Sequence, residues 1–230
     1  MRTGFVNVNK PSGVSSGYAV NRIKKLAGLP CGHMGTLDPL ASGVLPVALG
    51  NAARLFDYML EKRKRYVAVF RFGVMSDTLD STGQLDFSNP FVPSEEALKE
   101  AVHAQIGEIM QVPPRYSAKS VNGVRAYQLA RQGKKVALKP KTVRVNEFSL
   151  AGGDGDTFTF VIRCGGGTYV RSLGRDLAAK LGTCACMTRL VREKSGYFTL
   201  ANSIGVEQLD RWREHFIEPD AVFEMPSLDF

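Results

Sequence analysis

Gly32-His33-Met34-Gly35-Thr36-Leu37-Asp38-Pro39-Leu40-Ala41-Ser42-Gly43-Val44-Leu45-Pro46 is the stretch of this 230-residue sequence from which its fold and chemistry are best inferred. The stretch holds three glycines, two prolines and a single carboxylate, Asp38. Glycines permit backbone angles that side chains forbid, and prolines fix others, so we expect one defined path. Pro39 also keeps Asp38 out of the helical region. The stretch therefore predicts a rigid loop that presents one carboxylate.

Two interpretations of Asp38 remain open from residue types alone. Leu37 and Leu40 place the carboxylate in apolar company, where burial is costly unless a cation or hydrogen bonds stabilise the charge. A reaction that needs a positioned anion would use such a group. An aspartate before a proline is also common in turns and as a helix cap, with no catalytic role.

The rest of the chain alternates strand and helix patterns. Alternating apolar residues and cap signals predict strands at 5–9, 66–73, 142–150, 157–163 and 183–199, and helices at 15–28, 51–60, 94–106 and from about 170 to 181. The turns at 151–156 and elsewhere favour antiparallel connections. We therefore expect an α/β fold of the α+β type, with a mixed, largely antiparallel central sheet and flanking helices.

The charge is unevenly distributed along the chain. The formal net charge is +8, yet residues 206–230 hold seven acids and two arginines, so the preceding 205 residues carry +13. A basic body of this size favours a polyanionic partner, with nucleic acid first among the candidates. We expect residues 206–230 to form an acidic C-terminal tail.

Residues 115–144 are the most basic part of the sequence. They contain no acid, and the tyrosines Tyr116 and Tyr127 are interleaved with the cations Arg115, Lys119, Arg125, Arg131, Lys134, Lys135, Lys139, Lys141 and Arg144. Cations bind phosphates and aromatic rings stack on bases, so the segment is expected to be an RNA-contacting arm. The shorter run at 62–65 either contacts phosphates or is simply solvated.

Several function classes find no support. The N-terminus lacks an apolar signal region, and no apolar run is long enough for a membrane span. The cysteines are too few and too irregularly spaced for a disulfide framework or a zinc site: Cys31, Cys164, Cys184 and Cys186. We expect a cytoplasmic protein with reduced thiols, no metal and no cofactor.

The stretch GHMGTLDPLASGVLPVALG resembles the signature loop of the TruB family of pseudouridine synthases, whose aspartate in LDP is catalytic. Three further motifs resemble that family: NKPSGVSS near the N-terminus, the loop at 76–83, and GTYVRSL at 167–173. The first of them, NKPSGVSS, is expected to pack against the aspartate loop. The resemblance implies the pseudouridine synthase fold and makes Asp38 the catalytic residue. It also identifies the basic segment 115–144 with the RNA-binding "thumb" of the family.

The resemblance also implies roles for other side chains. Arg171 would pair with Asp38, and Asp77 or Asp80 would bond Arg171. Tyr66 would lie against the uracil, with Tyr169 and Leu190 closing the pocket. His33 would occupy or prop the vacated space, although a loop hydrogen bond explains it equally well. The expected substrate-binding residues are thus His33, Tyr66, Tyr169, Arg171 and Leu190.

The function implied by the resemblance is isomerisation of a uridine in tRNA, at position fifty-five in the T loop. It requires no guide RNA, cofactor or metal, and which atom Asp38 attacks stays open. Family members usually continue into a PUA domain, which this sequence lacks, so we expect residues 1–230 to be a single catalytic domain. A monomer is the default.

Two alternatives remain at this point. The same pocket and basic arm would suit a non-catalytic RNA-binding or tRNA-folding protein. The glycine-rich turn at 164–171 would suit a phosphate-using or nucleotide-using enzyme, although neither GxGxxG nor GxxxxGK fits it.

Overall fold

The structure, a computed structural model, describes residues 3–117, 120–121, 124–126, 129, 132 and 138–223. The chain divides into two compact units. One, here called the terminal unit, comprises Met1–Tyr66 and Leu190–Phe230, and the other, the central unit, is Val67–Arg189. Two strands, β4 (Lys64–Phe72) and β12 (Ala185–Ser195), belong partly to each unit.

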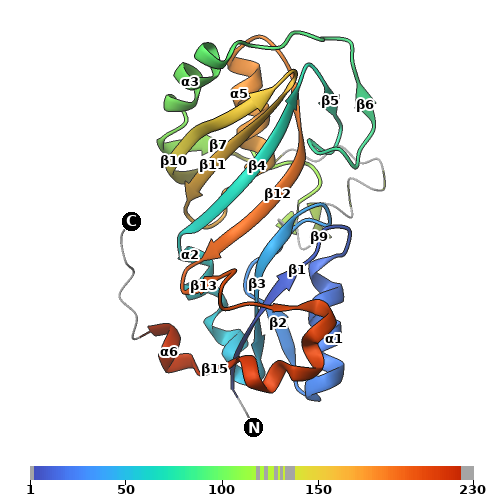
Figure 1. The fold of residues 1–230 in the computed structure, drawn as a ribbon, viewed down its shortest axis with the longest axis vertical. Coiled ribbons are helices and arrows are strands. Elements are labelled where there is room, and N and C mark those ends of the chain that lie inside the picture. Colours follow the sequence, from blue (N-terminus) through green and yellow to red (C-terminus); the bar gives the residue numbers. More distant parts are fainter. Residues whose placement is uncertain are drawn as a thin grey trace. The chain divides into compact units, whose positions relative to one another are not determined.

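The terminal unit is built on a sheet with the strand order β14-β1-β3-β12 (Figure 1). Strands β1 and β3 pair antiparallel, whereas β14 beside β1 and β12 beside β3 run parallel. Its strands besides β4 and β12 are β1 (Gly4–Lys10), β2 (Cys31–His33), β3 (Ser42–Leu49), β13 (Phe198–Thr199), β14 (Ile204–Gly205) and β15 (Phe216–Ile217). Its helices are α1 (Ser16–Ala27), η1 (Gly50–Leu55), α2 (Phe56–Glu61), η2 (Val206–His215) and α6 (Pro219–Phe223).

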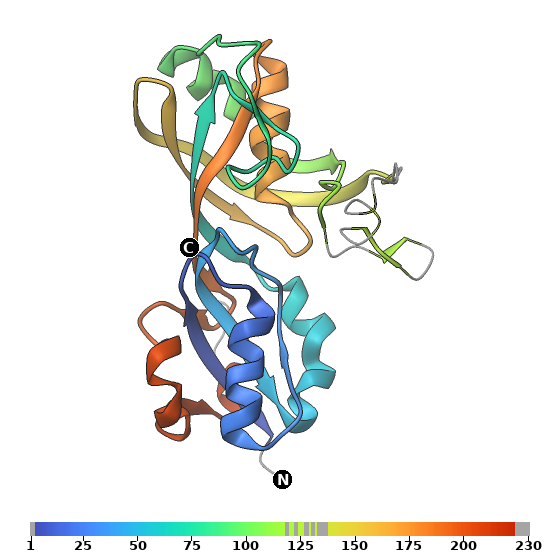
Figure 2. The ribbon, with the colours of Figure 1, turned by 90° about the vertical axis from the view of Figure 1, so that its right-hand side faces the viewer.

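Helix α1 covers one face of this sheet (Figure 2). The sequence predicts Ser15 or Ser16 as its N-cap and Gly28 as its end, and the structure uses Ser15 and Gly28. The Ser15 side chain accepts a hydrogen bond from the amide of Tyr18, and Gly28 ends the helix in the left-handed conformation. The core of the unit includes Phe5 and Phe198, whose rings meet edge to face at 5.6 Å.

Up to residue 223, the acidic segment is folded as part of the terminal unit and does not form a tail. Strands β14 and β15 flank β1 on its free edge, and η2 buries Val206, Leu209 and Trp212. The acids therefore lie on an element with an apolar inner face. The net charge of the segment did not reveal this, because burial depends on which face a residue occupies.

The central unit is a sheet with the order β12-β4-β11-β10-β7, with α3 and α5 together on one face (Figure 1). Its elements are β5 (Met75–Ser76), β6 (Leu85–Asp86), α3 (Glu95–His103), β7 (Gly107–Gln111), β8 (Ser120–Val121), β9 (Val124–Arg125), β10 (Lys141–Asp154), β11 (Thr157–Cys164) and α5 (Val170–Lys180). The pairs β10–β11 and β10–β7 are antiparallel, as expected.

Aromatic rings form the core of the central unit. Phe160 on β11 packs against Phe70, Phe72 and Phe148 with centroid separations of 5.4 to 6.5 Å. Helix α5 approaches this core at Gly174, where an added Cβ would come within 2.4 Å of the Phe70 ring. A glycine at this position therefore lets the helix that carries Arg171 pack closely on the sheet.

Several predicted boundaries were wrong. The strand expected at 183–199 is two strands, β12 and β13, and the helix expected at 51–60 is the 3-10 helix η1 followed by α2. The turn expected at 151–156 is narrower, because β10 continues to Asp154 across a β-bulge near Leu150. Strand β4 begins at Lys64, two residues earlier than expected, and the Lys64 side chain is buried. Across the part of the chain that the structure describes, no helix combines the length and apolar character needed to cross a membrane.

Gly43 provides a test of how closely β12 approaches β3. Its φ is +102°, and an added Cβ would lie 2.3 Å from the carbonyl oxygen of Arg192. Gly43→Ala therefore adds a steric clash to the cost of a positive φ, which is itself about 1–2 kcal/mol. We expect urea unfolding to show a clearly larger loss for Gly43→Ala than for the control Gly13→Ala, which has φ +89° in open space. Equal losses would contradict the close approach.

Candidate active site

The turn before α1 and the first residue of that helix hold the Asp38 loop by four hydrogen bonds. The amide of Gly13 donates to the carbonyl of Pro39 at 2.8 Å, and the Ser12 hydroxyl donates to that of Leu40 at 2.6 Å. The Ser16 hydroxyl both donates to the Leu37 carbonyl and accepts from the Leu37 amide, at 2.8 and 2.9 Å. The prediction that the NKPSG motif packs against the aspartate loop is confirmed.

Lys10 completes this support from inside the protein. Its side chain is fully buried, and its ammonium donates to the carbonyls of Pro11, Val14 and Pro39 at 2.8, 2.7 and 3.3 Å. Burial lowers the pKa of Lys10 to about 8, while the negative charge of Asp38 raises it and the positive charge of Arg192 lowers it. A buried cation and the half-buried Asp38 carboxylate thus interact within the terminal unit.

The loop itself is a turn closed on Asp38. The amide of Ala41 donates to the Asp38 carbonyl at 3.0 Å, with Pro39 at the second position, where its fixed φ suits a turn. The amide of Met34 donates to the Pro46 carbonyl at 2.8 Å, which ties the two ends of the loop together. Met34 is only 2% exposed and belongs to the core of the unit.

Sequence reasoning missed Arg192. Its side chain is 2% exposed and donates to the carbonyls of Gly35, Thr36 and Val44, all of which lie in or beside the Asp38 loop. The available signal was strand periodicity, since Arg192 lies two residues beyond Leu190 on β12 and so on the same face. An arginine in an apolar strand is normally assigned to the exposed face, and the sequence offered no sign of its carbonyl partners.

His33 lies on β2 at the start of the loop and is half-buried. Burial lowers the pKa of its imidazole, and the positive charge of Arg192 acts in the same direction. The ring is therefore neutral at neutral pH. A hydrogen bond to the His33 backbone itself acts in the opposite direction and raises the pKa. Both expectations for His33, a substrate contact and a loop hydrogen bond, stay open.

Tyr66 and Leu190, the expected pocket walls, are 6% and 5% exposed and lie on β4 and β12. The cations just before Tyr66 are not simply solvated. Lys64 is buried and donates to the Lys62 carbonyl at 2.6 Å, and Arg65 forms an ion pair with Glu193. These two side chains serve the terminal unit itself.

In the central unit, Arg171 is held by Asp80 and by two carbonyls. Its guanidinium donates to the carbonyls of Thr78 and Tyr116 at 2.8 and 2.9 Å and lies 3.7 Å from the Asp80 carboxylate. The prediction that Asp77 or Asp80 bonds this arginine is confirmed for Asp80. Arg171 is 5% exposed, so its fork is fixed in direction. Its expected pairing with Asp38 stays a prediction.

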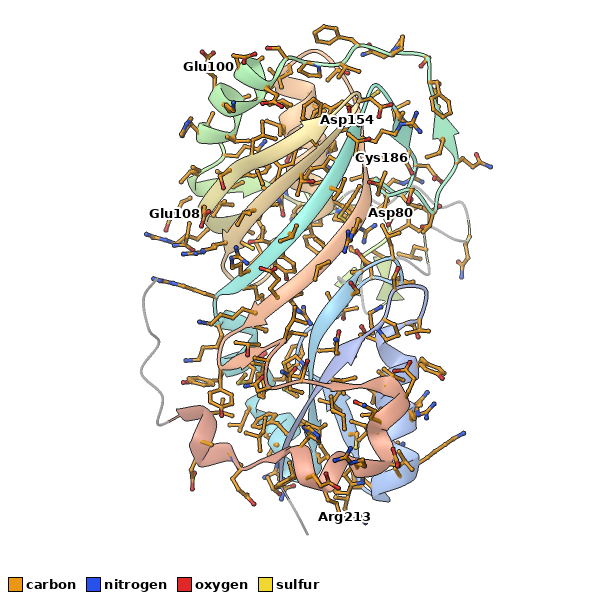
Figure 3. All side chains as sticks on the ribbon, in the orientation of Figure 1. Asp80, Glu100, Glu108, Asp154, Cys186 and Arg213 are labelled. Atoms are coloured by element: carbon orange, nitrogen blue, oxygen red, sulfur yellow. The ribbon has the colours of Figure 1, made fainter. Side chains whose placement is uncertain are left out.

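Asp80 is itself rigidly held. One carboxylate oxygen accepts from the Thr78 and Thr82 hydroxyls at 2.8 and 2.5 Å. The loop is anchored to β12, where Met187 accepts a hydrogen bond from the Ser81 amide at 2.9 Å and donates one to the Leu79 carbonyl at 3.0 Å. Figure 3 shows Asp80 near Cys186 of that strand. The negative charge of Asp80 adds to the effect of burial in raising the pKa of the Cys186 thiol.

Tyr169 precedes α5, and its backbone is held by a buried glutamine. The Tyr169 amide donates to the Gln111 side-chain oxygen at 2.8 Å, and the Gln111 amide group donates to the Tyr169 carbonyl at 3.2 Å. Gln111 is 1% exposed. A protein side chain thus occupies a donor that a bound phosphate would need, which weakens the nucleotide-binding alternative.

The basic arm is described only in part. Lys119, Arg131, Lys134 and Lys135 lie outside the described residues, and so does Tyr127. Arg115, Lys139, Lys141 and Arg144 are described and exposed. Within the described ranges the four cysteines are free thiols, and no group of three or more potential ligands among His, Cys, Asp and Glu is close enough to hold a metal ion.

Comparison with known proteins shows the family to which the chain belongs. The family model for the TruB family pseudouridylate synthase (N terminal domain) matches residues 24–170. The chain belongs to the TruB family of pseudouridine synthases. The tRNA pseudouridine synthase B of Anaplasma phagocytophilum is 41% identical over 212 residues, which cover 91% of this chain and 71% of the relative. That of Clostridium acetobutylicum is 39% identical over 224 residues, which cover 96% and 78%.

Solved structures place this TruB family member in the pseudouridine synthase fold. A chain from a crystal structure of a Cbf5–Nop10–Gar1 complex superposes with a TM-score of 0.70 at 30% identity, covering 95% of this chain and 58% of that chain. A chain from an H/ACA RNP bound to a substrate RNA containing 2'-deoxyuridine gives 0.66 at 28% identity, covering 95% and 57%. The activity of this TruB family member is that of a tRNA pseudouridine synthase, an isomerase.

Lys10 gives the terminal unit a pH dependence of known sign. The pKa of Lys10 is about 8 in the folded protein, against 10.5 for an unperturbed lysine. Between these pH values the unfolded chain binds more protons, so the contribution of this group to the free energy of unfolding rises with pH. In urea unfolding, the stability of the native protein should therefore rise relative to that of Lys10→Met between pH 8 and 10. Lys24→Met, at an exposed site on α1, is the control: the difference in stability between the native protein and this variant should stay constant over the same pH range. A constant difference between the native protein and Lys10→Met would contradict the lowered pKa.

Arg171→Lys tests whether the Arg171 guanidinium is needed for the reaction. Lysine cannot reproduce the planar set of donors that contacts two carbonyls and Asp80. We expect Arg171→Lys to remain folded by circular dichroism but to form pseudouridine at least roughly 100-fold more slowly in single-turnover reactions, the scale of a small misplacement in an active site. Arg175→Lys, one turn further along α5, is the matched control and should keep its rate. Unimpaired turnover by Arg171→Lys would remove this arginine from the mechanism.

Proposed function

We propose that this chain isomerises the T-loop uridine of tRNA, at position fifty-five, without a guide RNA, and that Asp38 is the catalytic group. The observation that carries this proposal is the support of one half-buried carboxylate by the loop that precedes α1 and by the buried ammonium of Lys10. A carboxylate whose loop has few alternative conformations is positioned before substrate arrives. Such positioning removes part of the entropic barrier to the reaction.

The base must leave its stack to be reached, so the enzyme needs a pocket with apolar and stacking walls. We assign these walls to Tyr66, Tyr169 and Leu190, of which Tyr66 and Leu190 are already buried in the free protein. We assign to Arg171 the stabilisation of the reacting carboxylate, because a guanidinium fixed by Asp80 keeps its direction without substrate.

His33 is assigned to the substrate rather than to the loop. Its ring is half-buried at the start of the Asp38 loop, and burial together with the positive charge of Arg192 lowers its pKa. A neutral imidazole offers one donor and one acceptor and can therefore pair with the polar groups of a nucleotide. A charged ring would be costly to bury in an apolar pocket.

The basic segment 115–144 is proposed as the arm that binds the T arm of tRNA. Four of its cations are described with exposed side chains: Arg115, Lys139, Lys141 and Arg144. The Arg144 guanidinium lies 3.8 Å from the Glu108 carboxylate. Exposed cations can contact phosphates, and each contact releases counterions that were condensed on the nucleic acid. We also propose a single catalytic domain made from the whole chain, in the cytoplasm, where its substrate would be found.

An unmodified tRNA transcript tests the proposal. In single-turnover reactions followed by carbodiimide treatment and primer extension, the native protein should produce a stop at the T-loop uridine. Asp38→Asn should be at least roughly 1000-fold slower, as expected when an essential reacting group is removed. Asp57→Asn, an exposed carboxylate on α2 of the same unit, is the control and should react normally.

Two results would contradict the proposal. Tight tRNA binding without any stop, for the native protein as well, would identify a tRNA-binding or tRNA-folding protein instead. A stop at another uridine would keep the activity but remove the T loop as its target.

A further inference from the structure

Arg192 is a fully buried cation that donates hydrogen bonds to the main chain in and beside the Asp38 loop. It is part of none of the sequence motifs described above, and the expected reaction assigns it no role. It lies on β12 opposite Gly43 of β3, where the two strands pair in parallel. Its Nε donates to the Val44 carbonyl at 2.7 Å, one Nη donates to the Gly35 carbonyl at 3.0 Å, and the other approaches the Thr36 carbonyl at 3.5 Å. Burial without hydrogen bonds would cost several kcal/mol, so these acceptors are needed.

The three acceptors lie on both sides of Asp38. Gly35 and Thr36 come three and two residues before it, and Val44 comes six residues after it. One planar guanidinium therefore bridges the incoming and outgoing arms of the loop. Because the donors of an arginine diverge at fixed angles, this bridge sets the separation of the two arms.

Two glycines lie beside Arg192: Gly43 lies against its main chain, and Gly35 lies at van der Waals distance from its guanidinium. At Gly43, an added Cβ would come within 2.3 Å of the Arg192 carbonyl oxygen, and at Gly35 it would lie 3.7 Å from an Nη atom. Both glycines have positive φ, at +102° and +129°. The loop thus follows a path around Arg192 that most side chains would not permit.

The charge of Arg192 also extends over the site. It is one of the influences that lower the pKa of Lys10 and of His33, so it acts on groups at both edges of the loop. Lys10 in turn interacts with Asp38. Arg192 is therefore coupled to the carboxylate both through the backbone it holds and through the charges around it.

We propose that Arg192 is a positioning residue for the catalytic Asp38, holding the two arms of its loop at the separation that the reaction requires. This inference rests on the proposed function of Asp38. It assigns Arg192 no contact with substrate. The side chain acts through the main chain of the loop, so its loss should slow the chemical step and leave tRNA binding in place.

The test compares Arg192→Lys and Arg192→Met with the native protein on an unmodified tRNA transcript. Lysine keeps the charge but cannot serve three carbonyls in this geometry, and methionine keeps the apolar stem alone. We expect both variants to bind tRNA within about 2-fold of the native dissociation constant. We expect the maximal single-turnover rate to fall by roughly 100-fold or more in each, which is the cost of a catalytic group displaced by about 1 Å.

A stability control separates positioning from a general weakening of the fold. Leu209→Ala removes a fully buried side chain under η2 in the same unit, away from the Asp38 loop. Assayed well below its own melting temperature, it should keep the native single-turnover rate although it unfolds earlier. A merely structural Arg192 would behave in the same way as Leu209.

Each remaining result has a definite meaning. A native rate in Arg192→Lys, or a loss confined to tRNA affinity, would overturn the positioning role. Failure of both Arg192 variants to fold would also overturn it, since the arginine would then be required by the unit as a whole. If the native protein itself forms no pseudouridine, the proposed function of Asp38 fails first, and that outcome is distinguishable from the others.

Discussion

The active-site loop depends on donors for its main-chain carbonyls, because these carbonyls have no partners from strand pairing. Residues 34–41 lie between β2 and β3 and belong to neither strand, yet Leu37 is 3% exposed and Ala41 is fully buried. Buried carbonyls must find donors, because the cost of leaving them unpaired is comparable to a lost hydrogen bond. Side chains from outside the loop supply those donors: Lys10, Ser12, Ser16 and Arg192.

The same constraint explains why the donors are often charged. An ammonium or guanidinium offers several N–H groups and can serve carbonyls that lie in different directions. Lys10 and Arg192 each contact three carbonyls. Their two positive charges accompany a loop that carries one carboxylate, so the groups that satisfy the backbone also provide an electrostatic setting for Asp38.

In the central unit the buried group that needs partners is an anion, Asp80, which requires donors instead of acceptors. Asp80 is satisfied by the Thr78 and Thr82 hydroxyls and lies beside the Arg171 guanidinium. Leu79, between Thr78 and Asp80, has a φ of +63°, a conformation that side chains other than glycine rarely adopt. Such local strain is tolerated where surrounding contacts over-determine the backbone, and here those contacts fix the direction of Arg171.

Much of this organisation was predictable from local sequence signals. Strand β1, helix α1 with its Ser15 and Gly28 caps, and the support of the loop by the NKPSG motif followed from periodicity, capping and motif patterns. The link between Arg171 and Asp80 also followed from a motif. These features depend on residues that are close in sequence or that belong to a recognisable pattern.

Features set by long-range packing were missed. Nothing near Arg192 in the sequence shows that its partners lie about 150 residues away, and an arginine or lysine is assigned to the surface by default. Lys64 was misjudged for the same reason. The folded acidic segment is a third case, because β14 and β15 depend on a free edge of β1 that only the assembled sheet provides.

The central claim is that the Asp38 loop is built by the protein before any RNA binds. Hydrogen exchange of the free protein tests this at the amides of Gly13, Met34, Leu37 and Ala41, each of which donates to an acceptor in or beside the loop. If the loop is preformed, these amides should be protected nearly as well as those of β3 and should change little when tRNA is added. Exchange at the rate of an open loop in the free protein, with protection appearing only on tRNA binding, would contradict it.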